Sequence, residues 1–126
     1  MHAGGVPAIG RSAGFLVVAV ILAAPAGTAA LRSRPVSHTV NIEALQFSPQ
    51  VLVVNRGDRV TWINKDPFPH TVTARARSFD SAHIAPGQSW SFVAGTEGAY
   101  DYGCALHPSM NGQLVVKQAA PAGNHR

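Results

Sequence analysis

Residues 98–110 read G-A-Y-D-Y-G-C-A-L-H-P-S-M, and this stretch carries the strongest structural signal in the chain. Tyr100, Tyr102 and Cys104 stand at alternate positions, which places their side chains on one face of a β-strand. Two aromatic residues on one face indicate the side of a sheet that packs against a core. Cys104 is therefore expected to point inward where this strand ends.

Two residues after this strand and one far upstream complete a set of metal-binding side chains. His107 and Met110 follow the cysteine at steps of three residues, so a tight loop can turn a thiolate, an imidazole and a thioether toward one point. His70 directly follows the stiff segment P-F-P. Thiolate and thioether ligands suit copper, and two imidazoles with one thiolate and a weak axial methionine form the blue-copper arrangement. The sequence therefore predicts one copper ion bound by His70, Cys104, His107 and Met110.

Other chemistries fit this set less well. Zinc sites are usually built from Cys, His or carboxylate ligands without methionine, and the C-x-x-C-H motif of haem attachment is absent from the sequence. A Cys–His protease would need a substrate cleft that a small domain hardly provides, and it has no use for the methionine. A lone buried Cys or Met is usually a packing residue, so the combination of residues is what favours a metal.

The remaining sequence predicts short β-strands separated by Gly, Pro, Asn and Asp. The candidate strands are residues 36–42, 51–54, 59–64, 70–74, 88–92, 98–103 and 112–116. The turn at Asn55–Asp58 joins two of them and predicts a hairpin. No helical period of ten or more residues follows the amino-terminal region. Seven or eight strands at this spacing predict an all-β fold, a sandwich of two sheets.

The first thirty residues have the layout of a secretory signal peptide. Arg11 precedes an apolar run at residues 15–24, and small residues follow it. The run is about half the length of roughly 20 residues that a membrane-spanning helix needs, so cleavage is favoured over a retained anchor. Cleavage after Ala26 and cleavage after Ala30 both fit. A signal at residues 1–30 leaves a domain at 31–126.

Composition narrows the class further. The chain has 126 residues, 46% of them hydrophobic and 13% charged, which fits one folded domain. A formal net charge of +4, spread along the chain, does not indicate a nucleic-acid-binding protein. The single cysteine cannot form an internal disulfide. We expect a monomer without stable membrane insertion.

Several segments together resemble the cupredoxins, most closely the amicyanin, pseudoazurin and plastocyanin group. They are V-N-R-G-D-R-V-T-W-I-N-K-D at 54–66, P-H-T-V at 69–72, I-A-P-G-Q-S-W-S-F at 84–92, and the segment at 98–110. The resemblance covers roughly residues 39–117 and implies a Greek-key β-sandwich with one type 1 copper. It assigns the family's first histidine ligand to His70, its cysteine to Cys104, its second histidine to His107 and its axial methionine to Met110. The two-residue gap between the last two is typical of amicyanins.

The function that this resemblance implies is transfer of single electrons between larger redox proteins outside the cytoplasm, such as in the periplasm. A cytochrome c, an amine dehydrogenase or a reductase would fit as donor or acceptor, and the protein itself is not expected to be an enzyme. The family exposes its second histidine within an apolar patch. Residues placed to form that patch here are Pro67, Phe68, Pro69, Ala105, Leu106 and Pro108. Lys65 is the best candidate for steering an acidic partner. A copper-binding or copper-delivery protein with the same ligands is the alternative.

The resemblance also predicts hydrogen bonds to the cysteine sulfur. Thr71 holds the place of the residue whose backbone N–H usually bonds this sulfur. Leu106 stands where the related proteins commonly have a proline, so it can offer a second N–H···S bond. The other histidines of the predicted domain at 31–126, His38, His83 and His125, have no ligand spacing and are expected to be structural or exposed.

Overall fold

The computed structural model describes residues 4–5, 10, 13–21 and 34–119. Residues 15–21, the described part of the apolar run, have exposed side chains and form neither helix nor strand. No helix within these described ranges is long and apolar enough to cross a bilayer. The predicted cleavage positions, Ala26 and Ala30, and the end of the chain at 120–126 lie outside the described residues.

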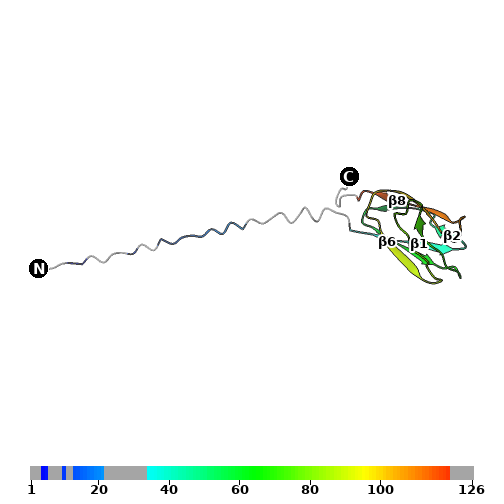
Figure 1. Cartoon of the computed structure of the whole chain (residues 1–126). Helices are drawn as coiled ribbons and strands as arrows, with labels where there is room; N and C mark the ends of the chain where they lie inside the picture. The colour runs from blue at the N-terminus through cyan, green and yellow to red at the C-terminus, as the bar shows by residue number, and fades with distance from the viewer. Residues whose placement is uncertain (1–3, 6–9, 11–12, 22–33, 120–126) are drawn as a thin grey trace.

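The described part of the chain forms eight strands in two four-stranded sheets (Figure 1). The strands are β1 (Ser37–Glu43), β2 (Gln46–Ser48), β3 (Val51–Asn55), β4 (Arg59–Asn64), β5 (Thr73–Ala74), β6 (Ser89–Val93), β7 (Gly98–Gly103) and β8 (Asn111–Lys117). The first sheet has the order β2-β1-β4-β6 and the second the order β3-β8-β7-β5. The predicted all-β sandwich is confirmed.

One predicted pairing is wrong. β3 and β4 do not form a hairpin, because β3 pairs in parallel with β8 in the second sheet while β4 pairs in parallel with β1 in the first. The turn between them carries the chain from one sheet to the other. Gly57, with φ of 97°, donates its N–H to the carbonyl of Ala94. A glycine turn of this kind serves a hairpin and an inter-sheet corner equally well, so the sequence did not separate the two. The short strand β2 is a further element that the sequence pattern did not reveal.

Aromatic side chains fill the space between the sheets. Trp62 on β4 is fully buried, and its Nε1–H donates to the hydroxyl of Tyr102 on β7 at 3.2 Å. The two rings meet edge to face with centroids 5.6 Å apart. Burial raises the pKa of Tyr102 to about 12, and the Trp62 hydrogen bond opposes this only partly. The strand face predicted to be apolar, with Tyr100, Tyr102 and Cys104, does point into this core.

A buried carboxylate ties the start of β1 to the turn between β3 and β4. Asp58 is 3% exposed and accepts N–H groups from Val36 at 2.9 Å and from Asn55 at 3.0 Å. His38 Nε2 lies 2.9 Å from Oδ2, the oxygen that also accepts the N–H of Asn55. Burial alone would raise the pKa of Asp58, but these hydrogen bonds outweigh burial and lower it. The histidine is structural, as expected.

We expect Asp58→Asn to lower the free energy of unfolding at neutral pH by about 2 kcal/mol, because a carboxylate that accepts three bonds is replaced. A depressed folded-state pKa gives stability that is present above the unfolded-state pKa and lost as pH falls through the folded-state value. That value lies below 3.8, so the difference between the two proteins should shrink in this acid range. Urea denaturation at a series of pH values measures it. The exposed Asp101→Asn is the control, and a pH-independent difference would contradict this account.

Candidate metal centre

The loop between β7 and β8 is closed by its own backbone. Cys104 N–H donates to the carbonyl of Met110 at 3.3 Å, and Met110 N–H donates to the carbonyl of His107 at 3.0 Å. A side chain at Gly103 would bring its Cβ within 2.8 Å of the same Met110 carbonyl, so glycine permits the close approach of strand and loop. These contacts return the chain so that both ends of the loop, Cys104 and Met110, are buried.

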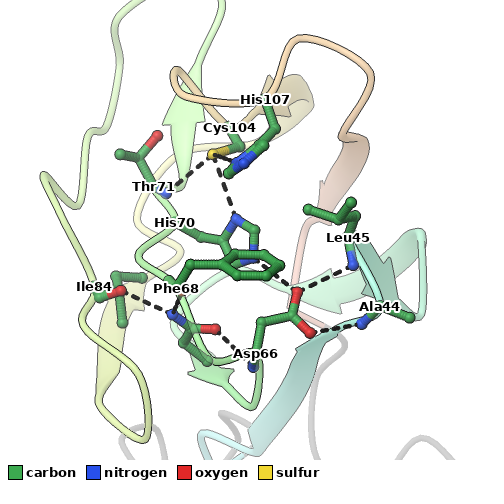
Figure 2. Close-up of polar contacts among 10 residues, drawn as sticks. Ala44, Leu45, Asp66, Phe68, His70, Thr71, Ile84, Cys104 and His107 are labelled. Carbon is green, nitrogen blue, oxygen red and sulfur yellow. Dashed lines mark hydrogen bonds and ion pairs between the residues drawn. The ribbon is translucent and has the colours of Figure 1, made fainter.

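Three of the predicted ligands converge (Figure 2). The Sγ of Cys104 lies 3.7 Å from Nδ1 of His70 and 3.7 Å from Nδ1 of His107. All three potential ligand atoms lie within 4.8 Å of one another. His70 is fully buried, whereas His107 is half-buried. Met110 is buried at the end of the same loop.

The segment before His70 is organised by a buried amide. The Nδ2 of Asn64 donates to the carbonyls of Phe68 and Ile84, each at 2.9 Å, and its Oδ1 accepts the N–H of Asp66 at 3.0 Å. His70 in turn exchanges two backbone hydrogen bonds with Ile84. The histidine is therefore held by this bridge, and the strand predicted at 70–74 shrinks to β5 at Thr73–Ala74.

Asp66 fixes the orientation of the His70 ring. Its Oδ2 lies 2.8 Å from Nε2 of His70, and the two carboxylate oxygens also accept the N–H groups of Ala44 at 2.7 Å and Leu45 at 3.0 Å. Burial alone would raise the pKa of Asp66, but bonds from Leu45, His70 and Ala44 outweigh it and lower the pKa. An ionised carboxylate only accepts, so Nε2 is the ring nitrogen that donates to Asp66, and Nδ1 is the one that faces Cys104.

Asp66 is the main residue of the site that sequence reasoning missed. Ala44 and Leu45, which it binds, both have positive φ values, 52° and 59°, in the turn between β1 and β2. That turn is more than twenty residues away in sequence. The only available signal was an acidic residue four positions before a candidate ligand.

We expect Asp66→Ala to lower the free energy of unfolding of the metal-free protein by about 3 kcal/mol, because two amides and one imidazole lose a buried acceptor. Affinity for Cu(I) should fall about 10- to 100-fold, the usual cost of losing the hydrogen bond behind a metal-binding histidine. Chemical denaturation and competition with a Cu(I) chelator measure the two effects. Glu43→Ala, an exposed acid at the end of β1 beside the same turn, is the matched control. Unchanged copper affinity in Asp66→Ala would contradict the orienting role.

Thr71 holds the Cys104 end of the loop through two bonds. Its N–H donates to the sulfur of Cys104 at 3.3 Å, as predicted, and its hydroxyl accepts the N–H of Ala105 at 2.8 Å. The predicted second N–H···S bond is wrong. Among the residues that the structure describes, no hydrogen bond joins Leu106 to the sulfur. Leucine at position 106 provides a backbone N–H that proline would lack, but this N–H does not bond the sulfur.

Phe68 lies against both histidines. Its ring centroid is 5.3 Å from that of His70 and 5.7 Å from that of His107. The ring is 38% exposed, so one side packs on the imidazoles and the other meets solvent. The residues predicted to surround His107 are all exposed: Pro67, Phe68, Pro69, Ala105, Leu106 and Pro108. Leu45, in the turn between β1 and β2, is a further exposed apolar residue, 42% exposed, that was not predicted.

The residues present fit a copper ion. One thiol and two imidazole nitrogens within 4.8 Å of one another, beside a buried methionine, form a soft donor set of the kind that copper prefers. The hydrogen bond from Thr71 holds the sulfur in position, and the Asp66 contact orients one imidazole. A two-sheet sandwich with such a donor set defines a mononuclear copper protein.

Comparison with known proteins agrees with this class. The chain belongs to the cupredoxin-like domain family, whose sequence profile matches residues 12–116. Copper is the cofactor of this family. The chain is 35% identical to amicyanin of Paracoccus denitrificans over 83 residues, and 30% identical to amicyanin-alpha of Methylorubrum extorquens over 116 residues. It is 36% identical to the chloroplastic plastocyanin of Tetradesmus obliquus over 87 residues.

The matches differ in how much of each protein they cover. The match to the Paracoccus protein spans 62% of this chain and 63% of that protein. The match to the Methylorubrum protein spans 81% of this chain and 98% of that protein. The match to the algal protein spans 59% of this chain and 60% of that protein. A solved Cu(I) amicyanin variant has a TM-score of 0.60 at 31% identity, covering 64% of this chain and 82% of that one. A copper-containing nitrite reductase from Thermus scotoductus has a TM-score of 0.61 at 26% identity, covering 70% of this chain and 23% of that enzyme.

Proposed function

We propose that this protein is an extracytoplasmic type 1 copper protein that carries single electrons between larger redox proteins. His70, Cys104, His107 and Met110 would hold the copper, which supplies a Cu(I)/Cu(II) couple when bound. Its amicyanin and plastocyanin relatives are electron carriers. The signal-like layout of the first thirty residues supports export to the periplasm or an equivalent compartment.

The observation that carries this proposal is the convergence of three ligand atoms, within 4.8 Å of one another, on a framework that holds them in place. Asp66 fixes one imidazole, Thr71 fixes the sulfur, and the loop closes on its own backbone. Ligands that are held rigidly move little when the charge of a bound metal changes, and a small rearrangement suits fast electron exchange. His70, Cys104, His107 and Met110 would leave no open position on the metal for a substrate, so we propose a carrier and not an enzyme.

His107 is the proposed point of electron entry and exit. It is the half-buried member of the set, and it lies among exposed apolar residues. A partner that docks on this surface, such as a cytochrome c, an amine dehydrogenase or a reductase, would approach the site without crossing the sandwich. The apolar character favours a contact that excludes water over a strongly charged one.

Copper delivery is the alternative function for the same residues. A delivery protein must release its metal to an acceptor, which is easier when the ligands are accessible. Here His70, Cys104 and Met110 are buried, 0%, 5% and 2% exposed respectively. Burial of these residues favours retention of the metal and hence the carrier function.

Visible and EPR spectra of the copper-loaded protein, followed by cyclic voltammetry, test the proposal. We expect an intense blue absorption, a type 1 EPR signal and reversible one-electron cycling without loss of copper. A colourless protein would overturn the type 1 assignment. A blue protein that passes its copper to a weak chelator in each cycle would favour delivery instead.

A further inference from the structure

An open recess lies on the flank of the metal loop. It has a volume of about 460 Å³, and Cys104 and Met110 belong to its lining. Residues of β5 and of the segment after it, including Arg75, Arg77 and Asp80, line it as well. The recess therefore brings charged side chains beside the residue that we propose as the copper thiolate.

The two arginines are available to a ligand. In the described part of the chain, neither Arg75 nor Arg77 forms an ion pair with a carboxylate. Arg75 donates to the side-chain oxygen of Asn111, the first residue of β8, which also lines the recess. A guanidinium has five N–H donors, so this neutral contact leaves most of them free for an oxyanion.

The segment that carries the arginines is held in a specific conformation. Arg77 has a φ of 64° and donates its N–H to the carbonyl of Ala74 at 3.0 Å, while Ala74 N–H donates to the carbonyl of Phe79 at 2.9 Å. A residue with a side chain is less stable in this left-handed conformation than in the right-handed one. Strain of this kind is a reason to look for function at the turn.

Asp80 is the one negative charge lining the recess, and its carboxylate is engaged. Its Oδ1 accepts from the Thr73 hydroxyl at 3.2 Å and from the N–H of Ala82 at 2.9 Å. The Thr73 hydroxyl oxygen lies 2.9 Å from that of Thr71, whose N–H bonds the Cys104 sulfur. A chain of hydrogen bonds thus joins the wall of the recess to the sulfur.

The recess is continuous with the apolar surface around His107, because Ala105 and Pro108 belong to both. A protein docked on the apolar surface would therefore extend over the recess. A buried small molecule would need a more enclosed cavity, whereas an open recess at the edge of an interface suits a side chain from the partner.

We propose that Arg75 and Arg77 form a docking pocket for an acidic side chain of the redox partner, beside the apolar contact at His107. This inference rests on the proposed function and names a property of the partner: an aspartate or glutamate next to its own apolar docking surface. The pocket differs from the sequence-based expectation, which favoured Lys65 for steering. The two arginines line a shared recess next to Cys104.

The test is titration of the Cu(I)-loaded protein with a capped tetraglutamate peptide at low ionic strength, followed through backbone amide chemical shifts. We expect shifts concentrated at Gly103, Ala105 and Asn111. Arg75→Gln and Arg77→Gln should each weaken binding about three-fold, and Asp80→Asn should tighten it about two-fold, as expected for exposed charge contacts. Arg56→Gln, in the turn at the far end of β3, is the matched control and should change binding less than about two-fold. A tetraglutamine peptide should not bind.

Each other outcome overturns the proposal. Equal weakening by Arg56→Gln would show attraction to net charge alone. Tighter binding of free phosphate or acetate than of the peptide would make the recess a site for small anions. Absence of any shift at the recess would remove the pocket, yet blue colour and reversible cycling would still stand, so failure of this inference is distinguishable from failure of the proposed function.

Discussion

Cys104→Ala is expected to yield a folded, colourless protein with greatly reduced affinity for copper. The intense absorption of a type 1 site requires the thiolate, and no second cysteine exists in the chain to replace it. Loss of a hydrogen bond behind a metal ligand lowers metal affinity up to about 100-fold. Copper affinity should fall further than this in Cys104→Ala, because a ligand itself is removed. Absorption spectra after copper loading and competition with a chelator measure both effects.

The variant should remain folded, because Cys104 is a small core residue at the end of β7 and alanine removes only its sulfur. Near-ultraviolet circular dichroism of the buried aromatic cluster checks this. Ser109→Ala, an exposed position in the same loop, should keep the colour and the affinity. Persistence of the blue band in Cys104→Ala would refute the assignment of the ligand.

Gly112→Ala is expected to destabilise the domain strongly, because the added methyl group would overlap the ring of Tyr102. Gly112 pairs with Tyr102 across β7 and β8, and a Cβ there would lie 2.4 Å from Cζ and 2.5 Å from the hydroxyl of that tyrosine. The tyrosine ring cannot move aside, because it is buried against Phe47 and Trp62, with centroids 4.8 Å and 5.6 Å away. We expect a loss of about 3 kcal/mol in the free energy of unfolding, at the upper end of the usual cost of overpacking.

Chemical denaturation of the metal-free protein measures this loss. Gly95→Ala is the matched control, because a Cβ there meets nothing within 4 Å, and it should change stability by less than about 0.5 kcal/mol. In a Tyr102→Leu background, Gly112→Ala should cost less than about 1 kcal/mol, since the ring that it strikes is gone. Equal losses in both backgrounds would place the cause elsewhere.

The sequence predicts those parts of the molecule that depend on local pattern. Alternation around Tyr102 predicted the core face of β7, and the spacing of Cys104 and His107 predicted their convergence. Both signals are local because strand periodicity and a short loop fix side-chain directions within a few residues. His70 was chosen for the chemistry of the donor set and its place after P-F-P, and the family resemblance supported that choice; local pattern alone could not show its contact with Cys104, which spans 34 residues.

The parts that escaped prediction depend on which distant segment the chain meets. Turn residues at 55–58 were recognised, but whether they close a hairpin or cross between sheets is decided by the pairing of β3 with β8. Asp66 lies in a stretch typical of a polar turn, and only the fold brings the amides of Ala44 and Leu45 to it. Leu106 has the N–H needed for a second sulfur bond, but among the described residues only the N–H of Thr71 makes a backbone bond to the sulfur.

The position of His70 between the two sheets also determines when the site can form during folding. Its Nε2 is held by Asp66, which follows β4 of the first sheet, and its Nδ1 faces Cys104, which follows β7 of the second. The donor set therefore exists only after both sheets have come together, a late event because the contacts join remote segments. Copper would bind this set only in the folded protein and would link the two sheets. It should therefore slow unfolding while leaving the rate of folding nearly unchanged.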